Sequence, residues 1–235
     1  MLVQALVGSQ DAAQRLSSTL VVVAHTDDEI LGAGSRLPLL REARFVYVSD
    51  GAPPEGTDAA RHGLSVRGYR QARRHEREVA LGLCGIAPDR VIDIGVPDQQ
   101  TSFHLADIAR RLADLVRQRE VHAVLTQPYE GGHPDHDATA FAVHAAVALV
   151  RARGAAAPEI VEMAGYHAGP NGPVAAIVAR SAIFTFCPTA SRYAPRTTTI
   201  SPALSSPVTA VSSPSLAPDF TSTRSAVLSA LMRIT

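Results

Sequence analysis

The sequence predicts an α/β fold with an open, mostly parallel sheet whose faces are covered by helices. Two observations carry this prediction: four short, strongly apolar runs of the kind that form buried strands, and four helical segments that alternate with them. Strands and helices in alternation imply right-handed crossovers between parallel strands, which gives a Rossmann-like sheet. A change of composition near residue 181 adds an irregular C-terminal tail to this domain.

The predicted strands share β-branched and aliphatic residues and few charges: Thr19 to Ala24, Arg44 to Ser49, Arg90 to Val96 and Val121 to Thr126. The predicted helices occupy the segments between and after them: Glu29 to Glu42, Tyr69 to Cys84, Phe103 to Arg119 and His136 to Arg153. The third shows its pattern most clearly, because Leu105, Ile108 and Leu112 recur at helical spacing. Sheets of this kind bind ligands beyond the carboxyl ends of their strands, so the loops there are the predicted functional region.

The chain is predicted to contain one catalytic domain, residues 1–180, followed by a Ser-, Thr- and Pro-rich tail, residues 181–235. The tail carries too little periodic apolar sequence to offset the entropy of ordering, so we expect it to be disordered or loosely packed. The composition breaks abruptly at 182–188, which suggests the hypothesis of a shifted reading frame. Sequencing the locus tests it, because an alternative frame should then encode an ordinary domain ending.

The composition favours a small-molecule substrate. Lys and Arg together number 22, and Asp and Glu together also number 22. The chain therefore lacks the excess of positive charge that is typical of nucleic-acid-binding proteins. We expect no membrane span and a cytoplasmic location, because no stretch approaches about 18 apolar residues and no basic leader precedes the first apolar run. A homo-oligomer is compatible with these features. The two cysteines, Cys84 and Cys187, are interpreted as buried hydrophobic residues.

Two similar motifs, His25–Asp28 (HTDD) and His133–His136 (HPDH), follow the first and fourth predicted strands. Each places two ligand-type residues three positions apart, so both can reach one ion from a helical turn. Neutral imidazole and carboxylate suit zinc, and three protein ligands with one open position are typical of catalytic zinc. Such an ion lowers the pKa of its bound water from about 15.7 toward ~7, which suits hydrolysis.

Three segments, AHTDDEILGAG, R-x-x-E (Arg73 to Glu76) and YEGGHPDHDA, resemble the PIG-L/LmbE-like family of metal-dependent N-acetylglucosaminyl deacetylases. The resemblance extends from about Thr19 to His167. It implies a Rossmann-like fold and a Zn²⁺-dependent hydrolase that removes an N-acetyl or other N-acyl group by attack of metal-bound water. The implied substrate is an amino-sugar-like small molecule or glycoconjugate.

The resemblance also implies residue roles. It implies three metal ligands: His25, Asp28 and His136. It implies three catalytic residues: Asp27 as the general base, His133 as the group that stabilises the oxyanion or protonates the leaving amine, and Asp135 as a residue suited to orient an imidazole.

The resemblance assigns two residues to the substrate: Arg73 and Asp98. We interpret the remaining arginines of the same helix as a solvated face. The sequence departs from the family at Thr26, where proline is usual, and in its C-terminal third, which lacks the family's pattern. Thr26 supplies no ligand, so we expect a change of loop rigidity there rather than loss of the metal.

Two alternatives to the deacetylase prediction stay open. Two histidines and one carboxylate also form the facial triad of non-haem iron oxygenases, and Fe²⁺ or another divalent ion would fit the same ligands. A metal-binding pseudoenzyme is the other alternative, because the C-terminal third departs from the family. Acetate release without oxygen separates the first, and metal content without turnover identifies the second.

Overall fold

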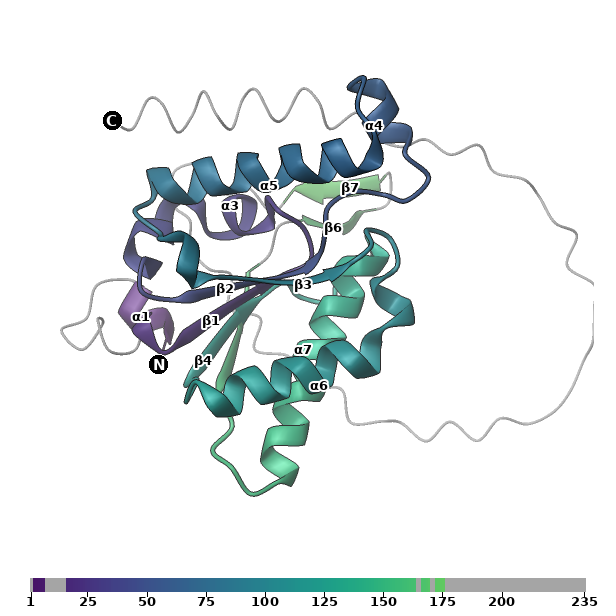
Figure 1. Cartoon of the computed structure of the whole chain (residues 1–235). Coiled ribbons are helices and arrows are strands. Elements are labelled where there is room, and N and C mark those ends of the chain that lie inside the picture. The colour runs from purple at the N-terminus through teal and green to yellow at the C-terminus, as the bar shows by residue number, and fades with distance from the viewer. Residues whose placement is uncertain (1, 7–15, 164–165, 170–171, 176–235) are drawn as a thin grey trace, which may run out of the picture. The chain divides into compact units, whose positions relative to one another are not determined.

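A computed structural model describes residues 2–6, 16–163, 166–169 and 172–175. Within these residues, five strands form one fully parallel sheet in the order β3-β2-β1-β4-β5 (Figure 1). They are β1 (Thr19–Val23), β2 (Arg44–Ser49), β3 (Val91–Val96), β4 (Ala123–Thr126) and β5 (Glu159–Glu162). Strands β6 (Tyr166–Gly169) and β7 (Gly172–Ala175) pair with each other in an antiparallel ribbon. The predicted open parallel sheet is confirmed.

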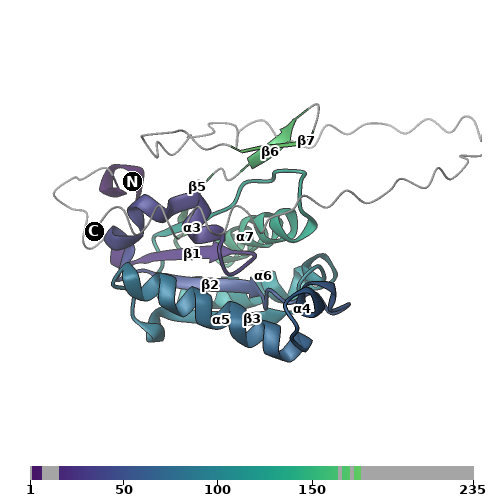
Figure 2. The same ribbon diagram turned by 90° about the horizontal axis from the view of Figure 1, so that it is seen from above.

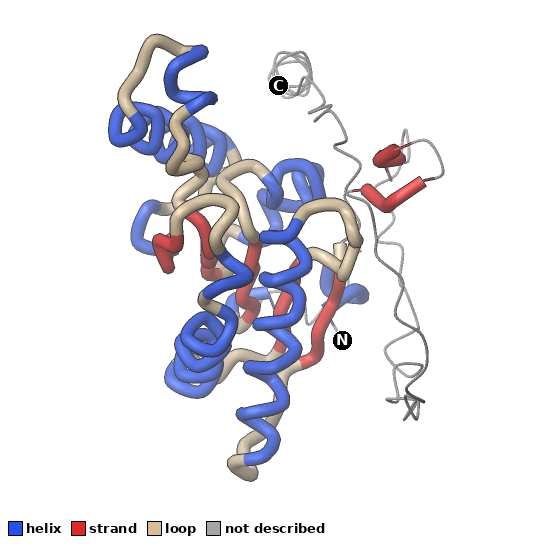
Figure 3. The backbone as a smooth tube through the Cα atoms, turned by 90° about the vertical axis from the view of Figure 1, so that its right-hand side faces the viewer, coloured by secondary structure: helices blue, strands red, loops and turns tan. Residues whose placement is uncertain are grey.

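Helices cover both faces of the sheet (Figures 1 and 2). One face packs against α1 (Leu2–Leu6), α3 (Asp28–Ala33) and α5 (Val66–Leu83), and the other against α6 (Leu105–Gln118) and α7 (Pro134–Ala152). The short helix α4 (Thr57–Arg61) precedes α5, and three 3₁₀ helices complete the described elements: Gly34–Leu40, Pro88–Arg90 and Thr101–Phe103. Figure 3 shows the strands of the five-stranded sheet lying between the helices of the two faces.

The two apolar cores follow from strand geometry, because successive side chains of a strand point to opposite faces. On β1, Val21 and Val23 belong to the core beneath α3 and α5, whereas Leu20 and Val22 belong to the core beneath α6 and α7. Since both faces are covered, the strand is buried throughout, which explains its uninterrupted apolar sequence.

The structure differs from the predicted elements in several places. The predicted helix from Glu29 to Glu42 is wrong in its second half: the α-helix ends at Ala33 and continues as a 3₁₀ helix that contains Pro38. A proline ring removes one backbone donor and clashes with the preceding turn of an α-helix. Helices α1 and α4 and strands β5, β6 and β7 were not predicted, because each spans only four or five residues.

Part of the sequence-based prediction falls beyond the described residues. The proposed tail, residues 181–235, lies outside them, as does Cys187. Cys84 is buried, as expected. Among the residues that the structure describes, no helix combines the length and the apolar character that a bilayer crossing requires.

Candidate metal centre

The two motifs meet at the point where the sheet changes its direction of winding. The chain builds β1, β2 and β3 outward on one side, then returns to add β4 and β5 on the other side of β1. Motif His25–Asp28 follows β1, and motif His133–His136 follows β4 after a short loop. Adjacent parallel strands with oppositely directed connections open a crevice at their carboxyl ends, where ligands bind in such folds. The topology therefore brings both motifs to one place.

Hydrogen bonds fix the carboxylate of Asp28 at the start of α3. Its Oδ2 accepts from the backbone N–H of His25 at 2.7 Å and from Nε2 of Gln127 at 2.7 Å. The same Gln127 accepts, through Oε1, the backbone N–H of Ala24 at 2.9 Å. Gln127 thus links the end of β4 to the end of β1. Burial favours the neutral acid, but hydrogen bonds with His136 and His25 outweigh it and hold the pKa of Asp28 far below its usual range.

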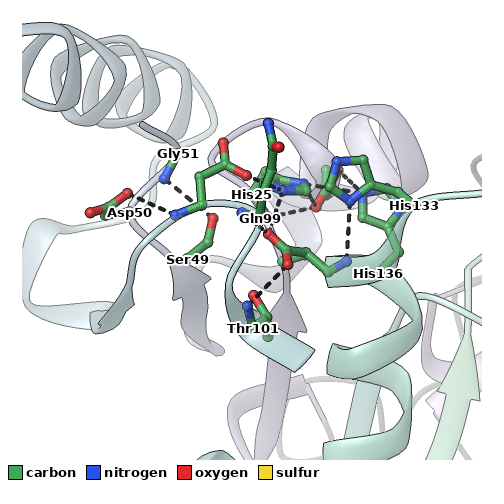
Figure 4. Close-up of polar contacts among 12 residues, drawn as sticks. His25, Ser49, Asp50, Gly51, Gln99, Thr101, His133 and His136 are labelled. Carbon is green, nitrogen blue, oxygen red and sulfur yellow. Dashed lines mark hydrogen bonds and ion pairs between the residues drawn. The ribbon is translucent and has the colours of Figure 1, made fainter. Parts of the chain in front are cut away.

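The second motif begins helix α7. His133 is the N-cap residue of this helix, and its Nδ1 accepts from the backbone N–H of Asp135 at 3.2 Å. Proline follows at the first helical position, where it is favoured. The fully buried carboxylate of Asp135 accepts the backbone N–H groups of Gln99 at 2.6 Å and Thr101 at 3.1 Å. The start of α7 is therefore tied to the loop that follows β3 (Figure 4).

Three predicted ligands surround one small volume. Nδ1 of His25 lies 3.1 Å from Nε2 of His136, and the two carboxylate oxygens of Asp28 lie 3.5 Å and 3.4 Å from these nitrogens. Tetrahedral zinc with bonds of about 2.0–2.1 Å separates its ligand atoms by roughly 3.3 Å. The donor set and its spacing fit such an ion. His133 is a geometric alternative, since ligand nitrogens of His25, His133 and His136 lie within 4.8 Å of one another.

Each of the two rings also contacts a carboxylate through its other nitrogen. Nε2 of His25 lies 3.2 Å from Asp98 and 3.4 Å from Asp135, and Nδ1 of His136 lies 2.9 Å from Glu130. With Asp28 included, four carboxylates face two imidazoles. This buried negative charge must be balanced, either by protons on the two rings or by a cation at the shared centre.

The carboxylates raise the pKa of both rings. Burial lowers the pKa of His25, but the carboxylates, Asp135 and Asp28 foremost, raise it well above its usual value. Burial likewise opposes protonation of His136, yet hydrogen bonds to Asp28 and Glu130 raise its pKa to about 9. Without an ion, protons on these rings balance the carboxylates, and metal binding would displace them.

Asp27 and Arg73 form a pair beside this centre. Asp27 is 42% exposed, and its Oδ2 lies 3.0 Å from Nη2 of Arg73. Arg73 is only 7% exposed and also binds Glu76 at 2.8 Å. The predicted solvated face of the remaining arginines is wrong for Arg77, which is buried between Asp93 and the ring of Tyr47.

The remaining predicted residues lie in the same contact network. Asp98 and Asp135 both contact His25. Asp135 was expected to lie beside an imidazole, and the ring that it contacts is that of His25. The ring of His133 stands edge-on to that of His25, with centroids 4.7 Å apart (Figure 4). Burial and the positive charges of His25 and His136 lower the pKa of His133.

Sequence reasoning missed two residues of this centre, Gln127 and Glu130. A polar residue directly after a buried strand was the available signal for Gln127. Glu130 lies inside the quoted segment YEGGHPDHDA, but nothing in the sequence connects its carboxylate with His136. Both side chains act on predicted ligands from the loop between β4 and α7.

Comparison with known proteins adds a family match. The profile of the family described as GlcNAc-PI de-N-acetylase (PIG-L) matches residues 20–147. No curated protein matches the chain.

Several solved structures are similar. The 4-carboxy-2-hydroxymuconate hydratase of Pseudomonas putida is 25% identical, with a TM-score of 0.51 and 65% of each chain covered. The N,N'-diacetylchitobiose deacetylase of Pyrococcus horikoshii is 22% identical, with a TM-score of 0.46 and coverage of 63% of this chain and 56% of that one. The deacetylase of an antimicrobial pseudoaglycone is 27% identical, with a TM-score of 0.48 and coverage of 58% and 60%. The chain thus spans less than two thirds of each of these proteins.

The substitution Gln127→Leu should lower the free energy of unfolding by about 1–3 kcal/mol, because it leaves the buried N–H of Ala24 without an acceptor and removes a donor from Asp28. Urea denaturation measures this. Gln118→Leu, on the exposed end of α6, is the matched control and should change the value little. Equal stabilities of the two variants would contradict the bridging role of Gln127.

Proposed function

The chain belongs to the PIG-L family of GlcNAc-PI de-N-acetylases, and from this membership we propose that it is a metal-dependent hydrolase that removes an N-acetyl or other N-acyl group. Its substrate would be an amino-sugar-like small molecule or a glycoconjugate. One observation carries the proposal: two imidazoles and a carboxylate surround one centre, and a second, more exposed carboxylate, Asp27, is adjacent in sequence. Amide hydrolysis needs such a combination of cation site and base.

We assign the cation to His25, Asp28 and His136, with Zn²⁺ as the leading candidate and Fe²⁺ as an alternative. When bound, the ion supplies Lewis acidity, which polarises an amide carbonyl and makes water more acidic. The protein's part is to hold these three side chains in place. It does so through the Gln127 bridge at Asp28 and through the carboxylates behind both rings.

Asp27 would act as the general base that takes a proton from the attacking water. Its exposure lets it reach a water in the crevice, and Arg73 holds its Oδ2 from the side at 3.0 Å. Interactions with Asp27 and Glu76 raise the pKa of Arg73, although burial opposes this, so the guanidinium remains charged. Arg73 would therefore orient the base in addition to its proposed contact with substrate.

His133 would donate a hydrogen bond to the oxyanion or a proton to the leaving amine. Its Nδ1 accepts from the backbone, so a neutral His133 carries its hydrogen on Nε2. The lowered pKa favours this neutral donor near pH 7. Asp98, which uses Oδ1 toward His25, could accept a substrate hydroxyl through its second oxygen.

One comparison favours a second candidate function. The similar structure with a TM-score of 0.51 is a hydratase rather than a deacetylase. The same cation site and base could instead direct water to a carbon–carbon double bond. The deacetylase remains the leading proposal, because the family profile covers more than half of the 235 residues.

The test uses the purified full chain, its measured metal content and a panel of N-acetylated amino sugars and their glycosides. Equimolar release of acetate and amine under anaerobic conditions, without a 2-oxo acid, supports the proposal and excludes an oxygenase. Loss of conjugated absorbance in unsaturated carboxylates, without acetate release from the panel, supports the hydratase. One bound ion with neither activity identifies a pseudoenzyme.

The substitution Asp27→Asn should lower kcat by at least about 100-fold while one equivalent of metal remains bound, because the amide cannot take the proton. His136→Ala should lose both metal and activity, because a ligand is removed. Metal analysis after dialysis and amine release measure the two effects. Equal metal loss in both variants would contradict the assignment of Asp27 as base.

The substitution His133→Asn should retain the metal and lower kcat by about 100–1000-fold, since asparagine preserves the helix cap but lacks the imidazole donor. His144→Asn, on the exposed side of α7, is the control and should leave kcat unchanged. Loss of metal in His133→Asn would instead show that His133 is a ligand.

A further inference from the structure

Glu130 lies directly behind one of the proposed metal ligands. Its side chain is only 1% exposed, and its Oε2 lies 2.9 Å from Nδ1 of His136. The opposite nitrogen of the same ring, Nε2, faces Asp28 at 3.4 Å and His25 at 3.1 Å. The ring therefore stands between a buried carboxylate and the proposed metal position.

The backbone holds Glu130 in this place. Oδ1 of Asp137 accepts the backbone N–H groups of both Glu130 and Gly131, each at 2.9 Å. Asp137 belongs to the first turn of α7 and directly follows His136. Gly131 adopts a φ of 68°, a conformation that glycine takes without strain. The carboxylate and the ring that it contacts are therefore carried by one hydrogen-bonded unit.

This geometry has a chemical consequence for metal binding. A neutral imidazole carries one hydrogen, and only the other nitrogen can bind an ion. A carboxylate that accepts the hydrogen of Nδ1 leaves the lone pair on Nε2 and makes that nitrogen more basic. Burying the carboxylate of Glu130 costs free energy, and a buried ion pair rarely adds enough stability to offset such a cost.

We propose that Glu130 is a positioning residue that holds His136 with its hydrogen on Nδ1 and its lone pair on Nε2, and thereby raises the affinity of the site for its metal. The inference rests on the ligand set of the proposed function. It concerns metal affinity, which is measured without substrate. A native protein that binds Zn²⁺ but releases no amine therefore contradicts the proposed function and leaves this inference intact.

The chain contains a matched control. His144 on α7 and Glu162 on β5 form a similar pair, with Nε2 of the ring 3.0 Å from the carboxylate. This pair is 46% and 27% exposed and includes none of the proposed ligands. Glu162→Gln therefore removes the charge of a histidine–glutamate pair without touching the metal centre.

The experiment measures Zn²⁺ affinity of the native full chain, Glu130→Ala, Glu130→Gln and Glu162→Gln by competition with a chromophoric chelator. Glu130→Ala should bind Zn²⁺ about 10–100-fold more weakly. Glu130→Gln should lie between it and the native protein, because the amide oxygen still accepts the Nδ1 hydrogen but carries no charge. Glu162→Gln should match the native protein.

Thermal unfolding of the metal-free proteins separates positioning from a purely structural role. A structural role lowers the Tm of Glu130→Ala but leaves the Zn²⁺ affinity of the folded protein within twofold of native, and that result overturns the proposal. If Glu130→Ala does not fold, Glu130→Gln decides, and native affinity in that variant overturns it. A native chain without Zn²⁺ affinity also overturns it.

Discussion

The candidate metal centre depends on the register between β1 and β4. Val22 pairs with Thr126, so the residues that leave the two strands, Ala24 and Gln127, stand close enough for the Gln127 side chain to bond the Ala24 backbone. That bond holds the backbone just before His25, and the Nε2 of the same Gln127 holds the carboxylate of Asp28. A slip of one residue would send every side chain of β4 to the opposite face of the sheet. The two apolar cores, which fix this register, therefore also fix the chemistry at the strand ends.

Charge balance is the second constraint on the centre. Backbone donors and the Gln127 amide compensate some of the buried carboxylate oxygens, yet the remaining negative charge exceeds what two neutral imidazoles can offset. Protons and a divalent cation are the two ways to restore the balance, and they compete for the same nitrogens. A cluster of this kind costs stability unless one of the two is bound, and such local costs are common at functional sites.

The sequence predicted the parts of the fold that depend on local pattern. Runs such as TLVVV identified the central strands because burial on both faces leaves no polar positions. The edge strand EIVE carries charges at both ends, so no comparable run marks it. The ligand-type residues were found because they sit in compact motifs after strands. The burial of Arg73 beside Asp27 depends on how α5 packs, and the role of Glu130 depends on the conformation of the loop before α7, so neither could be predicted.

The hydrogen bonds of Asp135 connect the candidate metal centre with the loop that follows β3. Its carboxylate receives two backbone N–H groups from the loop after β3 and also lies against the ring of His25. That loop carries Asp98, the residue we assign to the substrate. Any displacement of this loop would disturb the hydrogen bonds of the carboxylate that lies against this imidazole. One carboxylate therefore joins the loop of a proposed substrate residue to a proposed metal ligand.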